Sequence, residues 1–366
     1  MIKFYDLKKV NRKYEKSFHA KLEGFMDRGW YILGDEVKLF EENFANYCQS
    51  KHCIGVGNGL DALVLIFKAY IELGKLQKGD EVIVPANTYI ASILSILQAD
   101  LVPVLVEPKL ETYSLNPDLI AEKITSKTKA ILVVHLYGQL AEMDKIDTIA
   151  KQHNLLIIED AAQSHGAELE VSSLQLGVGN AKAFSFYPSK NLGCLGDGGA
   201  VITNDNEVNK MIRAMRNYGS EKKYFNDFIG INSRLDELQA FFLNVKLPDL
   251  NDDNQKRREI ANRYLTKIKN VKIILPFYDG SKNHVFHLFV IRTENRYELQ
   301  DYLKENGIEA MIHYPIPPHQ QKALNKFNSL SLPITEKIHR EVLSLPMSPV
   351  LTEEEVSSII QALNHY

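Results

Sequence analysis

A carboxylate and a lysine stand at two places in the sequence where both could act on one ligand. Asp160 closely follows the apolar run 155–158, and Lys190 lies on a turn that Pro188 marks, after a second run rich in apolar and aromatic residues. An apolar run this short indicates a strand that is buried on both faces. Open α/β sheets bind their ligands at the carboxyl ends of such strands. The two side chains are therefore expected at one edge of a sheet.

Together the two groups have the chemistry that pyridoxal phosphate requires of a protein. A lysine amine forms a Schiff base with the aldehyde of this cofactor, and a carboxylate keeps its pyridine nitrogen protonated. The chain contains 43 lysines and arginines, so spacing alone would favour a surface lysine and a helix-capping aspartate. The residues that flank Asp160 and Lys190 decide between the two interpretations.

Both flanks resemble the signatures of one enzyme family. Residues 159–166 and 184–193 are similar to those of the nucleotide-sugar aminotransferases of the DegT/DnrJ/EryC1/StrS family, and the similarity extends over nearly the whole chain. The resemblance implies a pyridoxal phosphate-dependent enzyme of the fold-type-I, aspartate aminotransferase-like class. Its fold would be α/β, with a mostly parallel central sheet and a smaller C-terminal α+β domain.

Composition and charge are ordinary for a globular protein. Of the 366 residues, 45% are hydrophobic and 24% are charged, and the net charge of −3 gives no indication of a nucleic-acid or membrane surface. Cys48, Cys53 and Cys194 are too few and too irregularly spaced for a disulfide framework or a zinc site, and no metal site is expected. Residues 1–17 are too charged for a signal peptide, and no apolar run approaches the ~18 residues of a transmembrane helix. A cytoplasmic protein is therefore expected.

The pattern of apolar residues predicts strands that alternate with helices. A helical arm is expected over residues 1–50, where apolar residues recur at helical spacing. Strands are then expected at 53–56, 81–84, 102–106, 130–134 and 155–158. Alternation of this kind favours a mainly parallel sheet with helices on both faces.

The character of the chain changes after a long, charged helical stretch over residues 234–269, which Pro248 interrupts. A strand over residues 284–292 and a helix over residues 296–306 then predict a smaller α+β unit. The expected domains are an N-terminal arm with a large cofactor-binding domain over residues 1–250, and a small domain over residues 251–366.

A glycine-rich run over residues 55–61 follows the first expected strand and opens a helix. Backbone amides at a helix N-terminus attract anions, and glycines let the backbone approach a phosphate closely. The third glycine is misplaced for a dinucleotide-binding fingerprint, so a nicotinamide site is a weak alternative. The resemblance places the cofactor phosphate here, on the amides of Gly59 and Leu60. Family members often carry Ser-Gly-Thr where this chain has Asn58-Gly59-Leu60, so one hydroxyl donor is missing.

The resemblance implies four further cofactor contacts. Ser185 would donate its hydroxyl to the phosphate, Tyr89 would stack on the pyridine ring, and Gln163 would reach the ring hydroxyl. Asn232 would cross a dimer interface to the phosphate of the neighbouring subunit, which would make the chain a homodimer with shared active sites. Without the resemblance, Ser185, Tyr89 and Asn232 would be a strand serine, a core tyrosine and a helix cap. The aromatic stretch 29–34 either packs as a loop or, by resemblance, lies near the active-site entrance and the subunit interface.

The reaction that the resemblance implies has two halves. Lys190 holds the cofactor, glutamate displaces it and leaves the pyridoxamine phosphate form, and the freed amine moves a proton as general base and acid. Asp160 stabilises the positive pyridine nitrogen. The aminated cofactor then gives its nitrogen to a ketone on a sugar ring. Relatives that carry histidine in place of the lysine dehydrate sugars instead, and Lys190 argues against that chemistry.

The sugar-binding residues are predicted from a segment near the C-terminal part of the chain. Residues 313–319 are aromatic, rich in histidine and stiffened by prolines, which suits a binding loop or a rigid interdomain turn. The resemblance places this segment and Tyr187 beside the sugar, so Tyr187, His313 and Tyr314 are assigned to the substrate. Lys223 is a candidate for a diphosphate contact, although a solvated loop lysine is the simpler interpretation.

The nature of the sugar is predicted from the amino-acid sequences of four segments, residues 29–34, 85–92, 134–138 and 216–220. These resemble enzymes that act on dTDP-3-keto-6-deoxyhexoses and make dTDP-3-amino-3,6-dideoxy-glucose or -galactose for bacterial surface polysaccharides. No residue type in the chain distinguishes the two configurations. A 4-keto sugar or a UDP-linked 3-keto sugar stays an alternative acceptor, whereas a non-catalytic role would conflict with the intact set of cofactor residues. The segment 168–180 departs from the lysine- and glycine-rich hairpin that is usual in the family.

Overall fold

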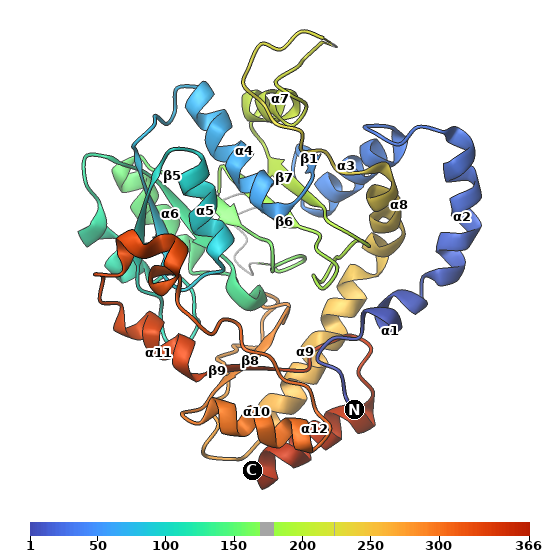
Figure 1. Cartoon of the computed structure of the whole chain (residues 1–366), viewed down its shortest axis with the longest axis vertical. Coiled ribbons are helices and arrows are strands. Elements are labelled where there is room, and N and C mark those ends of the chain that lie inside the picture. Colours follow the sequence, from blue (N-terminus) through green and yellow to red (C-terminus); the bar gives the residue numbers. More distant parts are fainter. Residues whose placement is uncertain (169–178, 223) are drawn as a thin grey trace.

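The computed structural model describes residues 1–168, 179–222 and 224–366 (Figure 1). Most of the divergent segment 168–180 lies outside the described residues. Lys223, with its expected diphosphate contact, lies outside them too.

The centre of the molecule is a seven-stranded sheet with the order β1-β7-β6-β5-β4-β2-β3 among the described residues. The strands are β1 (His52–Val56), β2 (Glu81–Pro85), β3 (Val102–Val106), β4 (Thr128–Val134), β5 (Leu156–Asp160), β6 (Ala181–Ser185) and β7 (Gly199–Thr203). β7 runs antiparallel to its neighbours β1 and β6, and the other pairs of the sheet are parallel. The predicted α/β class with a mostly parallel sheet is confirmed. The strand β7 is not among those predicted, because it follows a glycine-rich loop where the alternating pattern calls for a helix.

Helices cover both faces of this sheet (Figure 1). One face packs against α4 (Gly59–Glu72), α5 (Ile90–Gln98) and α7 (Asn206–Met215), and the other packs against α3 (Asp35–Tyr47), α6 (Met143–His153) and α8 (Glu237–Lys246). Successive side chains of a strand point to opposite faces. β1 therefore sends Ile54 and Val56 to the face covered by α4, α5 and α7, and Cys53 to the face covered by α3, α6 and α8. Burial on both faces explains why the strands read as continuous apolar runs.

The C-terminal part of the chain forms its own apolar cluster beside the sheet. This part of the chain contains α9 (Leu250–Lys267), α10 (Arg296–Glu305), α11 (Pro333–Glu341), α12 (Glu353–His365) and an antiparallel pair of strands, β8 (Phe289–Arg292) and β9 (Val342–Leu345). The strand expected over residues 284–292 is wrong in its first half. Phe286 has a φ of 44°, and its amide donates to His284 Nδ1 at 3.0 Å, so the backbone turns before β8 begins.

Pro248 interrupts the bridge between the two parts, as the sequence predicts. It lies in a short 3-10 helix, Leu247–Asp249, between α8 and α9. We propose that the domain boundary lies at this break, near residue 250. The N-terminal arm consists of α1 (Leu7–Arg12), α2 (Glu15–Arg28) and α3, and its first residues reach the C-terminal part, where Lys9 Nζ lies 3.2 Å from Glu355 Oε2 (Figure 1).

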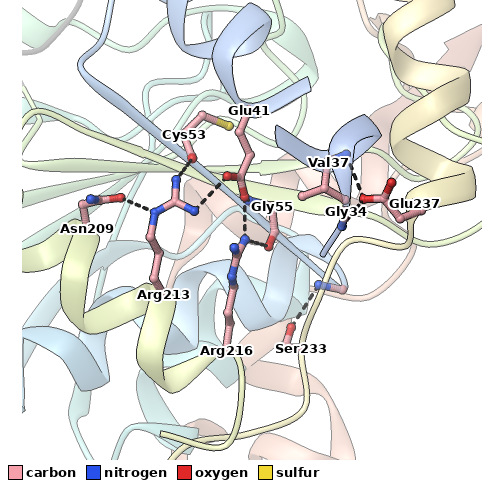
Figure 2. A network of polar contacts seen from close by, with 11 residues as sticks. Gly34, Val37, Glu41, Cys53, Gly55, Asn209, Arg213, Arg216, Ser233 and Glu237 are labelled. Carbon is pink, nitrogen blue, oxygen red and sulfur yellow. Dashed lines mark hydrogen bonds and ion pairs between the residues drawn. The ribbon is translucent and has the colours of Figure 1, made fainter. Parts of the chain in front are cut away.

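The N-terminus of α3 is capped by a side chain from α8. The buried carboxylate of Glu237 accepts hydrogen bonds from the amides of Gly34 at 2.7 Å and Val37 at 3.0 Å (Figure 2). It also accepts from the amide of Glu36 at 3.0 Å. These amides belong to the first turn, where a helix offers them no acceptor. A negative charge at this end is also favoured by the helix dipole. Glu237 therefore joins α3 to α8 beside the apolar cluster that contains Val37 and Ala240.

Replacing Glu237 by alanine is expected to lower the free energy of unfolding by about 3 kcal/mol, because three amides lose a charged acceptor in a buried place. Asp236→Ala is the matched control, since Asp236 is exposed and its side chain makes no capping hydrogen bond. The measurement is the unfolding free energy in urea. Equal stability of the two variants would contradict the capping role of Glu237.

Candidate active site

The carboxyl ends of β1 and β6 meet around the start of α4. A Cβ added to Gly59 would lie 2.7 Å from Ser185 Cβ, and one added to Gly199 would lie 2.4 Å from the carbonyl carbon of Asn58. These distances are shorter than any real carbon contact, so both positions need glycine. The close approach brings Ser185, at the end of β6, directly beside the first residue of α4.

The start of α4 offers a set of donors for an anion. Gly59 and Leu60 are its first two residues, and their amides have no acceptor within the helix. Asn58 caps the helix by accepting from the Asp61 amide at 2.8 Å. Ser185 Oγ accepts from the Tyr187 amide at 3.3 Å, which leaves its hydroxyl proton for another acceptor. Two amides, a hydroxyl and a helix N-terminus are suited to a phosphate.

The loop that precedes α4 is fixed from two sides (Figure 2). Arg216 Nη1 donates to the Gly55 carbonyl at 2.6 Å and to Glu41 Oε1 at 2.5 Å, while Glu41 Oε1 accepts from the Gly55 amide at 2.8 Å. Ser233 Oγ accepts from the Gly57 amide at 3.0 Å and donates to Asp61 Oδ2 at 2.7 Å. The backbone therefore reaches the start of α4 in one conformation.

Asp160 is the last residue of β5, and its carboxylate is nearly buried, with 8% exposed. Its Oδ2 accepts from Ser92 Oγ at 2.7 Å and its Oδ1 from the Ala162 amide at 3.2 Å. The predicted position of Asp160 at the carboxyl end of its strand is confirmed.

Lys190 lies on the turn after β6, and its side chain is half-buried. Burial lowers the pKa of its amine to about 8, although the negative charge of Asp160 acts in the opposite direction. Within the described residues, the amine has no hydrogen-bond partner. An amine with a pKa near 8 is a usable base and nucleophile close to neutral pH.

Gln163 joins the cofactor residues to the segment assigned to the sugar. Its Oε1 accepts from the Tyr137 amide at 2.6 Å, and its Nε2 donates to the Tyr314 hydroxyl at 3.3 Å. A backbone amide can only donate, so this contact fixes which end of the side-chain amide faces Tyr314. The ring of Tyr314 in turn lies 5.2 Å, between centroids, from that of Tyr89. Gln163 therefore presents its NH₂ group toward the two tyrosines.

His313 is tied into the same region. Tyr137 donates its hydroxyl to the His313 carbonyl at 2.5 Å, and His313 Nδ1 lies 2.9 Å from Ser344 Oγ. Burial and, to a smaller degree, the charge of Lys190 lower the pKa of His313 to about 4, so the ring is neutral at pH 7. Tyr187 is 54% exposed and Asn232 is exposed as well, so neither is held among these contacts.

Sequence reasoning missed the roles of three residues that hold the site together: Ser92, Tyr137 and Ser233, the last of which the sequence suggests only as a helix cap. All three lie in or beside segments that carry the family resemblance, but a hydroxyl or a backbone amide has no sequence pattern that reveals its partner. Only the fold brings them to Asp160, Gln163 and Asp61.

The residues present fit pyridoxal phosphate. The start of α4 and Ser185 form a phosphate cradle whose glycines leave no room for a Cβ. Asp160 provides a nearly buried carboxylate, and Lys190 provides an amine whose lowered pKa favours reaction with an aldehyde. Among the described residues, no group of three or more His, Cys, Asp or Glu side chains is arranged to hold a metal ion.

Comparison with known proteins agrees with this chemistry. The model of the DegT/DnrJ/EryC1/StrS aminotransferase family matches residues 12–364. The dTDP-3-amino-3,6-dideoxy-alpha-D-galactopyranose transaminase of Aneurinibacillus thermoaerophilus is 55% identical over 366 residues, which cover 100% of this chain and 99% of the relative.

Two solved structures have the same fold. The structure of S. venezuelae DesV in complex with a ketimine intermediate has a TM-score of 0.94 and 43% identity, and the match covers 99% of this chain and 97% of that one. The structure of NtdA from Bacillus subtilis with bound cofactor PMP has a TM-score of 0.91 and 32% identity, over 99% of this chain and 84% of that one.

The lowered pKa of Lys190 makes its acylation in the apoprotein depend on pH in a defined way. A depressed lysine pKa means that the neutral amine appears at lower pH, so the rate should reach half its maximum near pH 8. An exposed lysine in a reference peptide should do so near pH ~10.4. Competitive acetylation with mass spectrometry measures the pH midpoint of Lys190 and that of the peptide lysine. Asp160→Asn should move the Lys190 midpoint further down, and a midpoint equal to that of the peptide would contradict the buried environment.

Proposed function

Because this chain belongs to the DegT/DnrJ/EryC1/StrS aminotransferase family, we propose that it aminates a dTDP-linked 3-keto-6-deoxyhexose, with glutamate as amino donor. It is a pyridoxal phosphate-dependent aminotransferase. The proposed product is dTDP-3-amino-3,6-dideoxygalactose, a precursor of bacterial surface polysaccharide. The observation that carries this proposal is the 55% identity, over both full lengths, to a transaminase named for that sugar.

When bound, pyridoxal phosphate supplies an aldehyde that takes up the amino group and a ring that withdraws electron density from the reacting carbon. Gly59 and Leu60 bind its phosphate through their amides, and Ser185 does so through its hydroxyl. Asp160 keeps a proton on the ring nitrogen, and Gln163 donates its NH₂ group to the ring oxygen. Tyr89 packs on the ring face.

Lys190 moves the protons of both half-reactions. Its Nζ takes the proton from the α-carbon of glutamate and, in the second half, returns a proton to C3 of the sugar. The pKa of about 8 supports this role, since both the neutral and the charged amine are then available near neutral pH.

His313, Tyr314 and Tyr187 bind the sugar. Burial raises the pKa of the Tyr314 hydroxyl, which stays protonated and can donate a hydrogen bond. His313 Nδ1 is engaged by Ser344 Oγ, so the neutral ring offers its Nε2 to the sugar. Tyr187 follows Ser185 on the same turn, and its exposed ring is free to cover the ligand.

The active protein is a homodimer in which Asn232 binds the cofactor phosphate of the neighbouring subunit. Its exposed side chain supports this role, and so do the exposed aromatic residues Trp30 and Tyr31 in the stretch 29–34. Aromatic side chains are enriched at protein–protein interfaces. The proposed compartment is the cytoplasm, in keeping with the free thiols of Cys48, Cys53 and Cys194.

None of the helices in the described ranges combines the length and the apolar character that a membrane-spanning segment needs.

The absorbance of the bound cofactor tests the proposed substrate. Glutamate should abolish the band of the aldehyde form, and dTDP-3-keto-6-deoxygalactose should restore it at least about tenfold faster than its glucose epimer, because a site built for one hydroxyl orientation leaves polar groups unpaired with the other. Lys190→Ala is the control and should show no turnover, because it lacks the amine that moves the protons. Recovery with a dTDP-4-keto sugar or a UDP-linked 3-keto sugar instead would keep the mechanism and overturn the substrate.

Mixed dimers test the role of Asn232. Lys190→Ala and Asn232→Ala should each be strongly impaired, the second by about tenfold or more, since a phosphate loses a hydrogen bond. After subunit exchange, half of the dimers are mixed and one of their two sites is intact, so activity should recover to about a quarter of the unmodified level. Native mass spectrometry confirms the exchange. Mixed dimers without recovered activity would show that Asn232 does not act across the interface.

A further inference from the structure

A chain of buried hydroxyl groups ends at the carboxylate of Asp160. Ser92 Oγ lies 2.7 Å from Asp160 Oδ2, and Thr88 Oγ1 lies 2.8 Å from Ser92 Oγ. Thr88 and Ser92 are no more than 1% exposed, so neither hydroxyl has water as an alternative partner. None of the roles proposed above explains why two hydroxyls are placed there.

The directions of the two hydrogen bonds follow from the chemistry of the acceptor. An ionised carboxylate can only accept, so the single proton of Ser92 belongs to the contact with Asp160. Ser92 then has only lone pairs left for Thr88, which makes Thr88 the donor of the other bond. Hydroxyls aligned in this way polarise one another and strengthen the bond at the end of the chain.

We infer that Ser92, supported by Thr88, is a positioning residue that keeps Asp160 ionised and correctly oriented for the ring nitrogen of the cofactor. The inference rests on the proposed role of Asp160. Ser92 acts through that carboxylate and takes no part in the chemistry itself.

The hydrogen bond matters because the ring nitrogen and Asp160 share one proton. A donor to the carboxylate stabilises its charged form and so keeps that proton on the nitrogen. Without Ser92, the carboxylate holds the shared proton more strongly and the nitrogen loses it. A neutral ring withdraws less electron density from the reacting carbon.

The same helical turn also carries Tyr89. Tyr89 is the N-cap of α5, and its carbonyl accepts from the Ser92 amide at 3.2 Å. The first turn of α5 therefore sets the position of the residue proposed to pack on the ring and of the hydroxyl that holds the carboxylate.

Pyridoxamine phosphate is the probe for a test, because it binds without a covalent bond to Lys190. Ser92→Ala apoprotein should bind it about tenfold or more weakly by calorimetry, the effect expected for a lost hydrogen bond to a charged group. With nitrogen-15 in the ring, the resonance of the bound ligand should move from the protonated toward the unprotonated position. Thr88→Val should change both quantities in the same direction and by less.

Ser95→Ala is the matched control. Ser95 is equally buried on α5, but its hydroxyl donates to the Ser92 carbonyl at 2.7 Å instead of to Asp160. Affinity within about twofold of the unmodified protein and a protonated ring nitrogen are expected. A loss as large as that of Ser92→Ala would mean that packing of α5 is responsible, which would overturn the inference.

Asp160→Asn distinguishes a failure of the inference on Ser92 from a failure of the proposed role of Asp160. If it weakens binding and removes the proton from the ring while Ser92→Ala and Thr88→Val do not, the inference on Ser92 is wrong and the role of Asp160 stands. If Asp160→Asn changes neither quantity, the role of Asp160 fails as well. Thr88→Val nearly preserves the side-chain shape. If Ser92→Ala apoprotein does not fold, the affinity and the nitrogen-15 resonance of Thr88→Val provide the test.

Discussion

The opposition of a nearly buried carboxylate and a half-buried amine at one sheet edge is the interaction on which the site depends. Burial by itself would drive the pKa of Lys190 down, and the charge of Asp160 holds it near 8. The strand register decides which carboxylate does this. Asp160 pairs with Ala183 on β6, and a slip of one residue would bring Glu159 to the same place.

Glu159 shows how differently an adjacent carboxylate can be used. Alternation along β5 sends it to the other face of the sheet, where it binds Lys182 at 3.0 Å and His135 Nε2 at 2.9 Å. Burial acts against its charge, but Lys182 and His135 together lower the pKa of Glu159 to about 2. A carboxylate neutralised by two protein partners is structural, whereas the hydrogen-bond donors to Asp160, the Ser92 hydroxyl and the Ala162 amide, are uncharged.

The sequence predicts elements and positions well, and contacts poorly. Apolar runs bounded by polar residues locate the parallel strands, and they place Asp160 at a strand end, because burial on both faces leaves a local pattern. β7 and the turn at Phe286 are missed, since an antiparallel insertion and a left-handed residue depend on distant neighbours. The partners Ser92 and Tyr137 are missed for a related reason: a hydroxyl or a backbone amide becomes specific only when folding supplies its acceptor.

Gln163 links the residues proposed to bind the cofactor to the segment proposed to bind the sugar. Its carbonyl is held by the Tyr137 amide, and the hydroxyl of the same tyrosine holds the His313 carbonyl. Its NH₂ group reaches Tyr314, which lies next to His313. Tyr137, three residues after the end of β4, therefore fixes both the side-chain amide of Gln163 and the backbone at His313. A displacement of that segment would alter the hydrogen bonding of Gln163, so the residues proposed to bind the sugar and the side chain proposed to bind the cofactor ring are coupled through Tyr137 and Tyr314.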